Sequence, residues 1–246
     1  MSHEKSSIGL VMFSIYVWMV CFAWMFLLFV ATVVVMPIFP YRRTHDHIAA
    51  PGFGFVLKLL FVDLHIDYDP QFDHQQRSVF CQNHVNLLDA FVASAAIPHV
   101  FCGLMHSWQF WIPIYGWMMR VSKGIAVPKK SGANRLGAIV EQAKKRKDMN
   151  FSILTFPEGH RTHDGKVHEF RKGMFVMARE AGYPVVPIAV HGNFAINQKG
   201  SFVFRPGKIR VKVGPQFPTA GLSDEQLTAL AKKVQVWIKE IVEDPA

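Results

Sequence analysis

The chain opens with a long, uninterrupted run of apolar residues. Between Ile8 and Pro40 there is no charged residue and no His, Asn or Gln. A helix of these 33 residues would be about 50 Å long, whereas the hydrocarbon core of a bilayer is about 30 Å thick. The run is too long for the core of a signal peptide and lacks a small-residue cleavage site. We therefore expect it to stay on the protein as a membrane anchor.

Two arrangements of this segment fit its sequence. One is a single tilted transmembrane helix, and the other is a pair of shorter helices folded back within one leaflet. The single span is favoured, because no Gly, Pro or Asn between residues 10 and 36 marks a turn. Arg42 and Arg43 follow the run, whereas Lys5 before it is balanced by Glu4, so the end of the run is expected on the cytoplasmic side.

After residue 45, short apolar runs alternate with segments of helical periodicity. Several runs are continuous and β-branched, as expected of strands covered on both faces. Alternating strands and helices predict an α/β domain with a mostly parallel central sheet flanked by helices. The expected strands are Ser78–Cys81, Val100–Leu104, Gly124–Val127, Ser152–Phe156, Val185–Val190, Phe202–Phe204 and Ile209–Val213. The expected helices between them are Gly54–Phe61, Leu87–Ala96, Arg135–Arg146 and Lys172–Ala181.

A last helix is expected near the C-terminus. Ser223 is its N-cap and Gln226 completes a capping box. Its apolar stripe is formed by Leu227, Leu230, Val234, Trp237 and Ile241. The sequence has no internal repeat and no second boundary. We therefore divide the chain into an anchor, residues 1–45, and one α/β domain, residues 46–246.

Composition and charge narrow the classes of partner. Hydrophobic residues make up 50% of the chain and charged residues 18%, which excludes a disordered protein. Lys and Arg outnumber Asp and Glu by 27 to 18, almost wholly after the apolar run, so the domain is suited to a phosphate-bearing substrate or an anionic membrane face. No nucleic-acid recognition motif accompanies the charge, so no nucleic acid is expected. The three cysteines form no CxxC pair, which favours a reducing compartment.

The first candidate motif is Asn-His-Val-Asn-Leu-Leu-Asp at residues 83–89, between an expected strand and an expected helix. Catalytic groups often lie at such a junction, at the carboxyl edge of a parallel sheet. On one regular helix, His84 and Asp89 would point about 140° apart. They meet if His84 lies in the loop and Asn86 caps the helix, and Asp89 then holds one ring nitrogen while the other is free as a base. A cap aspartate beside an incidental histidine is the alternative.

The second candidate motif is Phe-Pro-Glu-Gly-His-Arg-Thr at residues 156–162, directly after an apolar strand. The turn brings the carboxylate of Glu158 and the guanidinium of Arg161 into one loop. A planar, permanently charged guanidinium suits a phosphate group. A surface turn with a solvated ion pair is the alternative for this motif alone.

Taken together, the two motifs resemble the PlsC-type glycerolipid acyltransferases, the 1-acyl-glycerol-3-phosphate acyltransferase family. That family has four ordered sequence blocks, the first written NHxxxxD and the third FPEGTRS. The resemblance covers roughly residues 60–215. The matching segments, in order, are residues 84–89 preceded by Asn83, 112–117 with 124–129, 156–162 and 185–190.

The resemblance implies an activity for residues 46–246 as an acyltransferase catalytic domain. His84 would act as general base and Asp89 would orient it, with no acyl-enzyme. The acyl donor would be acyl-CoA or acyl carrier protein, the acceptor would be lysophosphatidic acid and the product phosphatidic acid, without a cofactor or metal. A leading hydrophobic segment is usual in bacterial members, sometimes as a two-helix motif. The expected place is the cell inner membrane, with the catalytic domain on the cytoplasmic side.

The resemblance also assigns substrate-binding residues. Lys129, Lys130 and Arg161 would hold the acceptor phosphate. Glu158 and Gly159 belong to the same site, where Glu158 would orient Arg161 or the glycerol. Two departures stand out. A Pro-Lys-Lys run at residues 128–130 replaces the usual arginine of the second block, and His160 replaces the common threonine or serine of the third.

Other functions stay open. Another lysophospholipid, glycerol 3-phosphate or an amino-acid lipid would suit the same motifs. A membrane-bound metal-dependent hydrolase is one alternative. Its metal site would have to be drawn from the histidines at positions 45, 47, 160, 163 and 168 together with Asp164 or Glu169, and their spacing matches no common ligand pattern. A catalytically silent lipid-binding protein is a third alternative.

One aromatic stretch is assigned to no motif. Residues 108–111 read Trp-Gln-Phe-Trp. They suit core packing or anchoring at a membrane interface, and lining of an acyl groove is the alternative.

Overall fold

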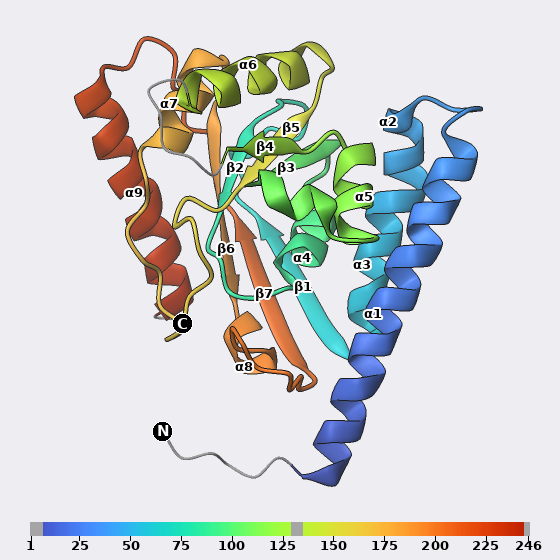
Figure 1. The fold of residues 1–246 in the computed structure, drawn as a ribbon. Coiled ribbons are helices and arrows are strands. Elements are labelled where there is room, and N and C mark those ends of the chain that lie inside the picture. The colour runs from blue at the N-terminus through green and yellow to red at the C-terminus, as the bar shows by residue number, and fades with distance from the viewer. Residues whose placement is uncertain (1–6, 129–134, 244–246) are drawn as a thin grey trace.

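A seven-stranded sheet forms the centre of the protein. The structure is a computed structural model that describes residues 7–128 and 135–243. The strand order is β1-β7-β6-β2-β5-β3-β4, and every neighbouring pair is parallel except β6 and β7 (Figure 1). The predicted mostly parallel α/β sheet is therefore confirmed. The strands are β1 Val62–Tyr68, β2 Val79–Gln82, β3 Phe101–His106, β4 Ile125–Val127, β5 Ser152–Thr155, β6 Val185–His191 and β7 Gly207–Val213.

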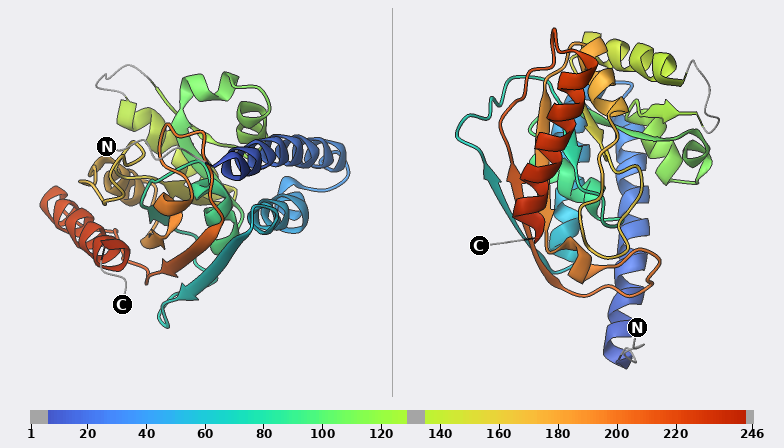
Figure 2. Two further views of the ribbon diagram at one scale, coloured as in Figure 1. Left: turned by 90° about the horizontal axis from the view of Figure 1, so that it is seen from below. Right: turned by 90° about the vertical axis from the view of Figure 1, so that its left-hand side faces the viewer.

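Helices cover both faces of this sheet. On one face lie α6, α7 and α9, and on the other lie α3 and α4, with α1 packed outside α3 (Figures 1 and 2). The layers follow from the sequence, because strands buried on both faces need apolar helices on either side. The helices are α1 Ile8–Val35, α2 Tyr41–Thr44, η1 His45–Ala49, α3 Ala50–Leu59, α4 Asp89–Ala96, η2 Ser107–Trp111, α5 Tyr115–Val121, α6 Arg135–Asp148, α7 Gly173–Glu180, α8 Asn193–Ile196 and α9 Asp224–Glu243.

Two apolar cores flank the sheet. The first joins α6, α7 and α9 to one face, and Phe175 and Tyr183 are among its fully buried members. The second joins α1, α3 and α4 to the other face around Phe80 and Leu57. All four residues of β2 and of β5 are buried, as their continuous apolar runs predicted. The middle of the sheet is thus a rigid support for the loops at its edge.

The N-terminal segment forms one unbroken helix that packs on the domain. In its most apolar window α1 has a mean hydropathy of 2.5 and is only 17% buried, and it is the one helix of the described ranges long and apolar enough to cross a membrane. The chain then reverses, and α2, η1 and α3 run back along α1 (Figure 1). Trp24 donates its indole N–H to the carbonyl of Gly52 over 2.8 Å. A side chain at Gly52 would collide with Leu28, so the glycine permits the close approach of the two helices.

Two expectations about strands need correction. The predicted strand Phe202–Phe204 is an irregular segment, because Phe204 turns inward against α1 and bonds Ser14 instead of a neighbouring strand. Residues 62–68, which we did not expect as a strand, form β1 at the sheet edge. Apolar and polar side chains alternate along these residues, as in a strand with one exposed face. The capping box of α9 is present as predicted, with Ser223 and Gln226 bonding each other reciprocally.

Candidate active site

The candidate residues gather where three central strands end. His84 follows β2, Glu158 follows β5 and Asn193 follows β6, and these three strands are adjacent and parallel. Their carboxyl ends therefore meet at one edge of the sheet. Asn83 fixes the end of β2, because its side-chain amide bonds both the N–H and the carbonyl of Val190 on β6.

His84 and Asp89 are in direct contact. The Nδ1 atom of His84 lies 2.7 Å from Oδ2 of Asp89. His84 lies in the loop after β2, as the sequence required for the two to meet. The expectation that Asn86 caps a helix beginning at Leu87 is wrong. Asn86 accepts the N–H of Leu88 within a turn, and α4 begins at Asp89 with Leu88 as its N-cap residue. Because the carboxylate can only accept a hydrogen bond, the ring proton lies on Nδ1. The lone pair is then on Nε2.

Asp89 is buried and surrounded by hydrogen-bond donors. It is 1% exposed. Its Oδ2 also accepts the backbone N–H groups of Val85 and Asn86, and its Oδ1 accepts the side-chain amide of Asn193 over 2.5 Å. These donors stabilise the ionised carboxylate and fix its orientation.

Asn193 was not predicted from the sequence. It is fully buried, and its carbonyl groups also hold the side-chain amide of Asn86. It lies 104 residues after Asp89, and no local pattern marks it. The available signal was its position just beyond the end of β6, at the edge where His84 was expected.

The free face of the histidine is partly open. The ring of His84 stacks on Phe156 with centroids 3.9 Å apart, and its side chain is 24% exposed. Among the described residues, Nε2 has no hydrogen-bond partner. A neutral imidazole held in this way can take a proton from a hydroxyl group placed at Nε2.

Three backbone N–H groups of this loop already donate hydrogen bonds to carboxylates. The N–H groups of Val85 and Asn86 bond Asp89, and the N–H of His84 bonds Glu158. Backbone N–H groups at the start of a loop or helix can supply the donors that stabilise the oxyanion of an acyl transfer. These three amides are turned to carboxylates instead, so they do not serve that role.

Glu158 links the two motifs. Its side chain is buried, with Oε1 accepting the N–H of His84 over 2.8 Å and Oε2 accepting the N–H of His168 over 3.1 Å. Burial raises the pKa of Glu158, and the two backbone donors oppose that rise. Both carboxylate oxygens therefore hold the protein's own loops together. The loop is tied again by the N–H of Thr162, which bonds the carbonyl of His84.

Gly159 supplies the sharp turn beside Glu158. Its φ is +77°, a conformation that residues with a side chain rarely adopt. A Cβ at this position would also lie 2.9 Å from the guanidinium carbon of Arg171. The glycine thus allows Arg171 to pack closely against the loop.

Arg161 lies half-buried in the same loop. Lys199 donates to its carbonyl over 3.1 Å, and within the described ranges no carboxylate is within ion-pair distance of the guanidinium. Burial raises the pKa of Tyr115, and the positive charge of Arg161 opposes the rise. Lys129 and Lys130 lie outside the residues that the structure describes.

The histidine-rich loop does not assemble a metal-ligand set. His168 bonds Asp164 over 3.0 Å, and Asp164 also accepts from Thr162. Side-chain and backbone donors lower the pKa of the exposed Asp164 to about 2. In the part of the chain that is described, no three His, Cys, Asp or Glu side chains converge as metal ligands would. The ring of His160 lies 6.1 Å from that of His168, in the solvated loop.

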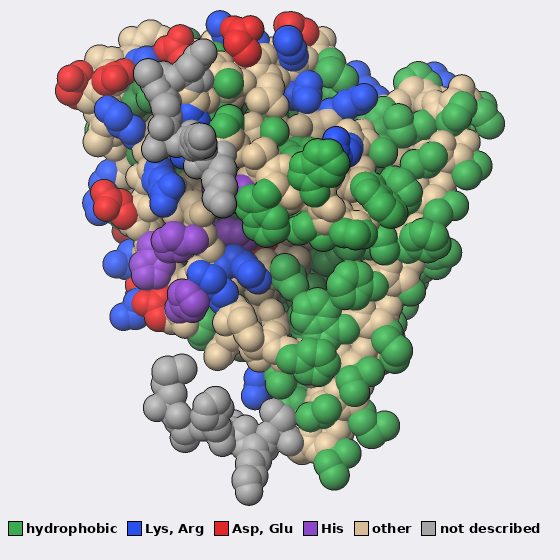
Figure 3. All heavy atoms as spheres, viewed as in Figure 1, with side chains coloured by type: hydrophobic (Ala, Val, Ile, Leu, Met, Phe, Trp, Pro, Cys, Tyr) green, Lys and Arg blue, Asp and Glu red, His purple; other side chains and the backbone are tan. Residues whose placement is uncertain are grey.

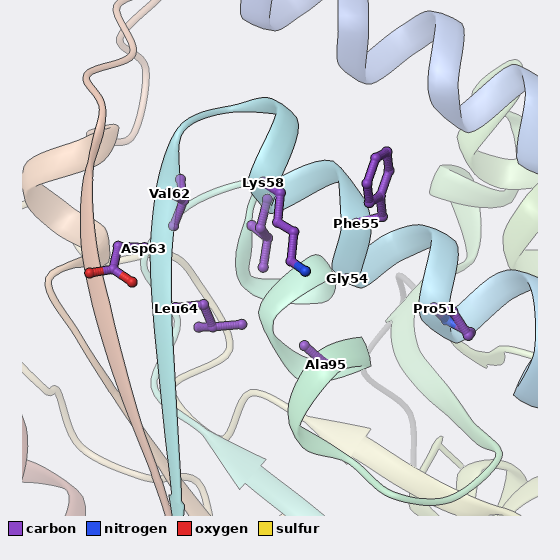
Figure 4. Close-up of a pocket in the computed structure, with 9 residues that line it drawn as sticks. Pro51, Gly54, Phe55, Lys58, Val62, Asp63, Leu64 and Ala95 are labelled. Carbon is purple, nitrogen blue, oxygen red and sulfur yellow. The ribbon is translucent and has the colours of Figure 1, made fainter.

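Two shallow grooves open on the surface of the described residues, and only the smaller one adjoins the site. One, of about 450 Å³, lies between α3, α4 and β1 and is lined by residues such as Phe55, Lys58 and Ala95 (Figure 4). None of the candidate site residues lines it. The other, of about 300 Å³, lies beside Val85 and His191, on the loop that carries His84.

The chain is similar to known acyltransferases. Residues 64–191 match the sequence model of a family described as "Acyltransferase". A 1-acyl-sn-glycerol-3-phosphate acyltransferase of Limnanthes alba is 26% identical over 94% of this chain and 83% of its own, and one of Pseudomonas aeruginosa is 24% identical over 84% and 80%. The crystal structure of the 1-acyl-sn-glycerophosphate acyltransferase PlsC of Thermotoga maritima superposes with a TM-score of 0.80 at 20% identity, covering 95% of this chain and 96% of that one.

Proposed function

Because the chain belongs to the acyltransferase family, we propose that it acylates the free hydroxyl of lysophosphatidic acid to give phosphatidic acid. The acyl group comes from a thioester, either acyl-CoA or acyl carrier protein. The names of relatives that align over most of the chain support this acceptor. The observation that carries the proposal is the His84–Asp89 pair. Within residues 7–128 and 135–243, Nε2 of His84 has no hydrogen-bond partner and the guanidinium of Arg161 in the adjoining loop has no ion-pair partner.

The His84 ring acts as the base. Its Nε2 takes the proton of the glycerol hydroxyl while the oxygen attacks the thioester carbonyl. Asp89 stabilises the imidazolium that forms, as in a serine-protease triad whose nucleophile is replaced by the substrate. When the tetrahedral intermediate collapses, the carbon–sulfur bond breaks and the proton passes from His84 to the departing thiolate. No protein residue is acylated.

Arg161 binds the acceptor phosphate. Its guanidinium forms two parallel hydrogen bonds to a phosphate, and the absence of a carboxylate partner among the described residues leaves it available. Lys129 and Lys130 add positive charge in this proposal. Glu158 and Gly159 shape the loop that carries Arg161, and Glu158 does so through its bonds to the backbone.

The apolar helix α1 attaches the enzyme to a membrane, and we place α1 within one leaflet. Its Ser14 and Trp18 bond the irregular segment at Phe202 and Phe204. If α1 crossed the bilayer upright, that irregular backbone would enter the hydrocarbon, where unpaired peptide groups are costly. The inner membrane is the proposed site, with the catalytic domain on its cytoplasmic side, because the anionic cytoplasmic leaflet attracts the arginines after the helix.

An acceptor panel tests the function. Purified enzyme in phospholipid vesicles is given one acyl-CoA and, in separate reactions, lysophosphatidic acid, lysophosphatidylcholine or glycerol 3-phosphate. We expect transfer to lysophosphatidic acid, and in Arg161→Ala a rise in KM for that acceptor of about 10²-fold, since a charged bidentate contact is lost. Exchange of the exposed Lys208 for Ala is the control and leaves KM unchanged. Preference for an acceptor without a phosphate monoester, unaffected by Arg161→Ala, contradicts the proposal.

A further inference from the structure

Three tryptophans are exposed on the segment between β3 and β4. Trp108 and Trp111 belong to η2 and Trp117 belongs to α5, and they are 54%, 77% and 43% exposed. We call these three residues the indole patch. Single exposed apolar side chains are common on soluble proteins, but grouped large aromatic side chains mark an interaction surface.

The fold holds these side chains outward. The intervening Phe110 is buried, and the backbone of Gly116 packs so tightly on the carbonyl of Phe110 that no side chain would fit there. Arg120 bonds the same carbonyl over 3.1 Å and lies 4.8 Å from the ring centre of Trp111. The patch is therefore presented by a packed segment and stiffened by a cation–π contact.

The tryptophans differ in whether the indole N–H group has a hydrogen-bond acceptor within the described residues. Trp18 and Trp24 of α1 donate to the carbonyls of Phe202 and Gly52. The three residues of the indole patch find no acceptor in the described ranges of the chain. An apolar ring with a free polar edge suits the boundary between headgroups and acyl chains.

The patch continues the apolar surface of α1. The rings of Trp117 and Phe29 are 5.7 Å apart, and α1 contacts α5. Along α1, Phe22, Phe26 and Val30 are about half exposed, at 52%, 48% and 40%. Figure 3 shows hydrophobic side chains covering the flank of α1 and continuing over the neighbouring α5 region.

The patch also borders the candidate active site. The segment begins with η2 directly after β3, and β3 is the parallel neighbour of β5, so it leaves the sheet at the same edge as the loop of Glu158 and Arg161. The segment therefore lies between the membrane anchor and the side chain proposed to bind the acceptor phosphate.

We propose that the indole patch is a second membrane contact, which rests in the headgroup layer beside α1 and holds the mouth of the active site against the lipid surface. This inference rests on the proposed function, because only an enzyme with a lipid acceptor needs its site at that depth. The occupant is a bilayer surface, as continuity with α1 and the free indole edges require. Arg120 at the rim of the patch faces the phosphate layer.

A fluorescent label tests the contact directly. A Cys21→Ala background is suitable, since the other cysteines, Cys81 and Cys102, are buried and burial raises the pKa of both thiols to about 12. Trp111→Cys carries an environment-sensitive dye, and Val236→Cys on the far helix α9 is the matched control, an exposed apolar site away from α1 (Figure 1). The full chain is placed in phosphatidylethanolamine–phosphatidylglycerol vesicles with or without brominated lipid.

We expect brominated lipid to quench the label at 111 and aqueous iodide to quench the label at 236. Quenching at 111 by iodide alone overturns the proposal and leaves a protein partner as the occupant. This readout needs no acceptor, so a wrong acceptor assignment and a wrong membrane contact are distinguishable.

Kinetics separate membrane contact from an acyl-groove lining. In the double variant Trp108→Ser, Trp111→Ser, the apparent KM for acceptor in vesicles rises about tenfold, because two indole rings lose their burial in lipid. Turnover of a short-chain lysophosphatidic acid, monomeric in solution, stays as in the wild type. Equal losses with both acceptors would assign the patch to the substrate groove and refute the membrane contact.

Discussion

At Asp89, four hydrogen bonds hold the carboxylate in place. Three donors bond Oδ2 and one, the amide of Asn193, bonds Oδ1. An ionised carboxylate held in this way keeps His84 in one tautomer and stabilises the imidazolium of the transition state. The orientation of the base thus depends on a residue from a different strand end.

We predict that Asn193→Ala slows chemistry more than binding. The loss of one donor frees the carboxylate to rotate, so kcat falls about tenfold while KM for both substrates changes little. Steady-state kinetics with acyl-CoA and lysophosphatidic acid measure the split. Asn197→Ala is the matched control, because its buried side-chain amide bonds Ser201 and Val203 instead of Asp89. A similar fall in kcat for the control would contradict a specific role of Asn193.

The sequence revealed part of this site. His84 and Asp89 belong to one short segment, so local geometry was enough to predict their meeting. The partners of Glu158 and Asp89 come from residues 74 and 104 positions away. Such partners depend on which strands are neighbours, and a single sequence does not encode strand order in any local pattern. Lys129 and Lys130 remain predictions.

At the scale of elements, a buried histidine joins the start of β5 to the loop before β2. His99 donates Nε2–H to the carbonyl of His74 over 2.7 Å, and its Nδ1 lies 3.1 Å from Oγ of Ser152. Burial lowers the pKa of His99 from 6.5 to about 4. The folded state therefore holds this ring neutral where the unfolded chain would protonate it.

This pKa shift predicts a pH dependence of stability. Between pH 6.5 and about 4 the unfolded chain binds the extra proton, so the contribution of His99 is present above pH 6.5 and is lost as the pH falls. Above pH 6.5 the wild type should have a higher free energy of unfolding than His99→Gln. This difference should shrink as the pH falls from 6.5 to about 4. Thermal unfolding in detergent at pH 4 to 8 measures it, with exposed His65→Gln as the control. A difference that stays constant with pH would refute the linkage.

Strands were predicted well where the side chains are apolar on both faces. For β2, β5 and β6 the apolar runs and the observed strands coincide within one or two residues. The error at Phe202–Phe204 has the same origin, since an apolar run also suits a segment that packs on a helix. The missed β1 lies at the sheet edge, where alternate side chains are exposed and the apolar run is broken.

At the scale of the whole molecule, α1 is part of the core as well as the proposed membrane anchor. Val17 is 1% exposed within the second core, and Ser14 accepts the N–H of Phe204 over 3.0 Å. Hydropathy predicted an anchor here, and the boundary at residue 45 remains a prediction. Hydropathy alone does not distinguish side chains that meet lipid from those that meet protein, which is why this packing was not predicted.

We predict that deleting residues 1–39 yields an insoluble chain instead of a detached catalytic domain. The deletion exposes the apolar face of α3 and removes the bonds to Phe202 and Phe204. Solubility and circular dichroism after expression without membranes measure the outcome. As a control, Met19→Gln with Leu27→Gln alters only exposed positions, so it weakens membrane binding and keeps the fold. A soluble, folded and active deletion product would contradict this account.

The most direct measurement is acyl transfer by His84→Ala in vesicles. Transfer from labelled acyl-CoA to lysophosphatidic acid should fall about 10³-fold or more, because the ring supplies the base for proton removal. Thermal unfolding in detergent should stay near that of the wild type, since the ring is partly open and its backbone bonds to Glu158 and Thr162 remain. Transfer at the wild-type rate by this variant would contradict the central claim.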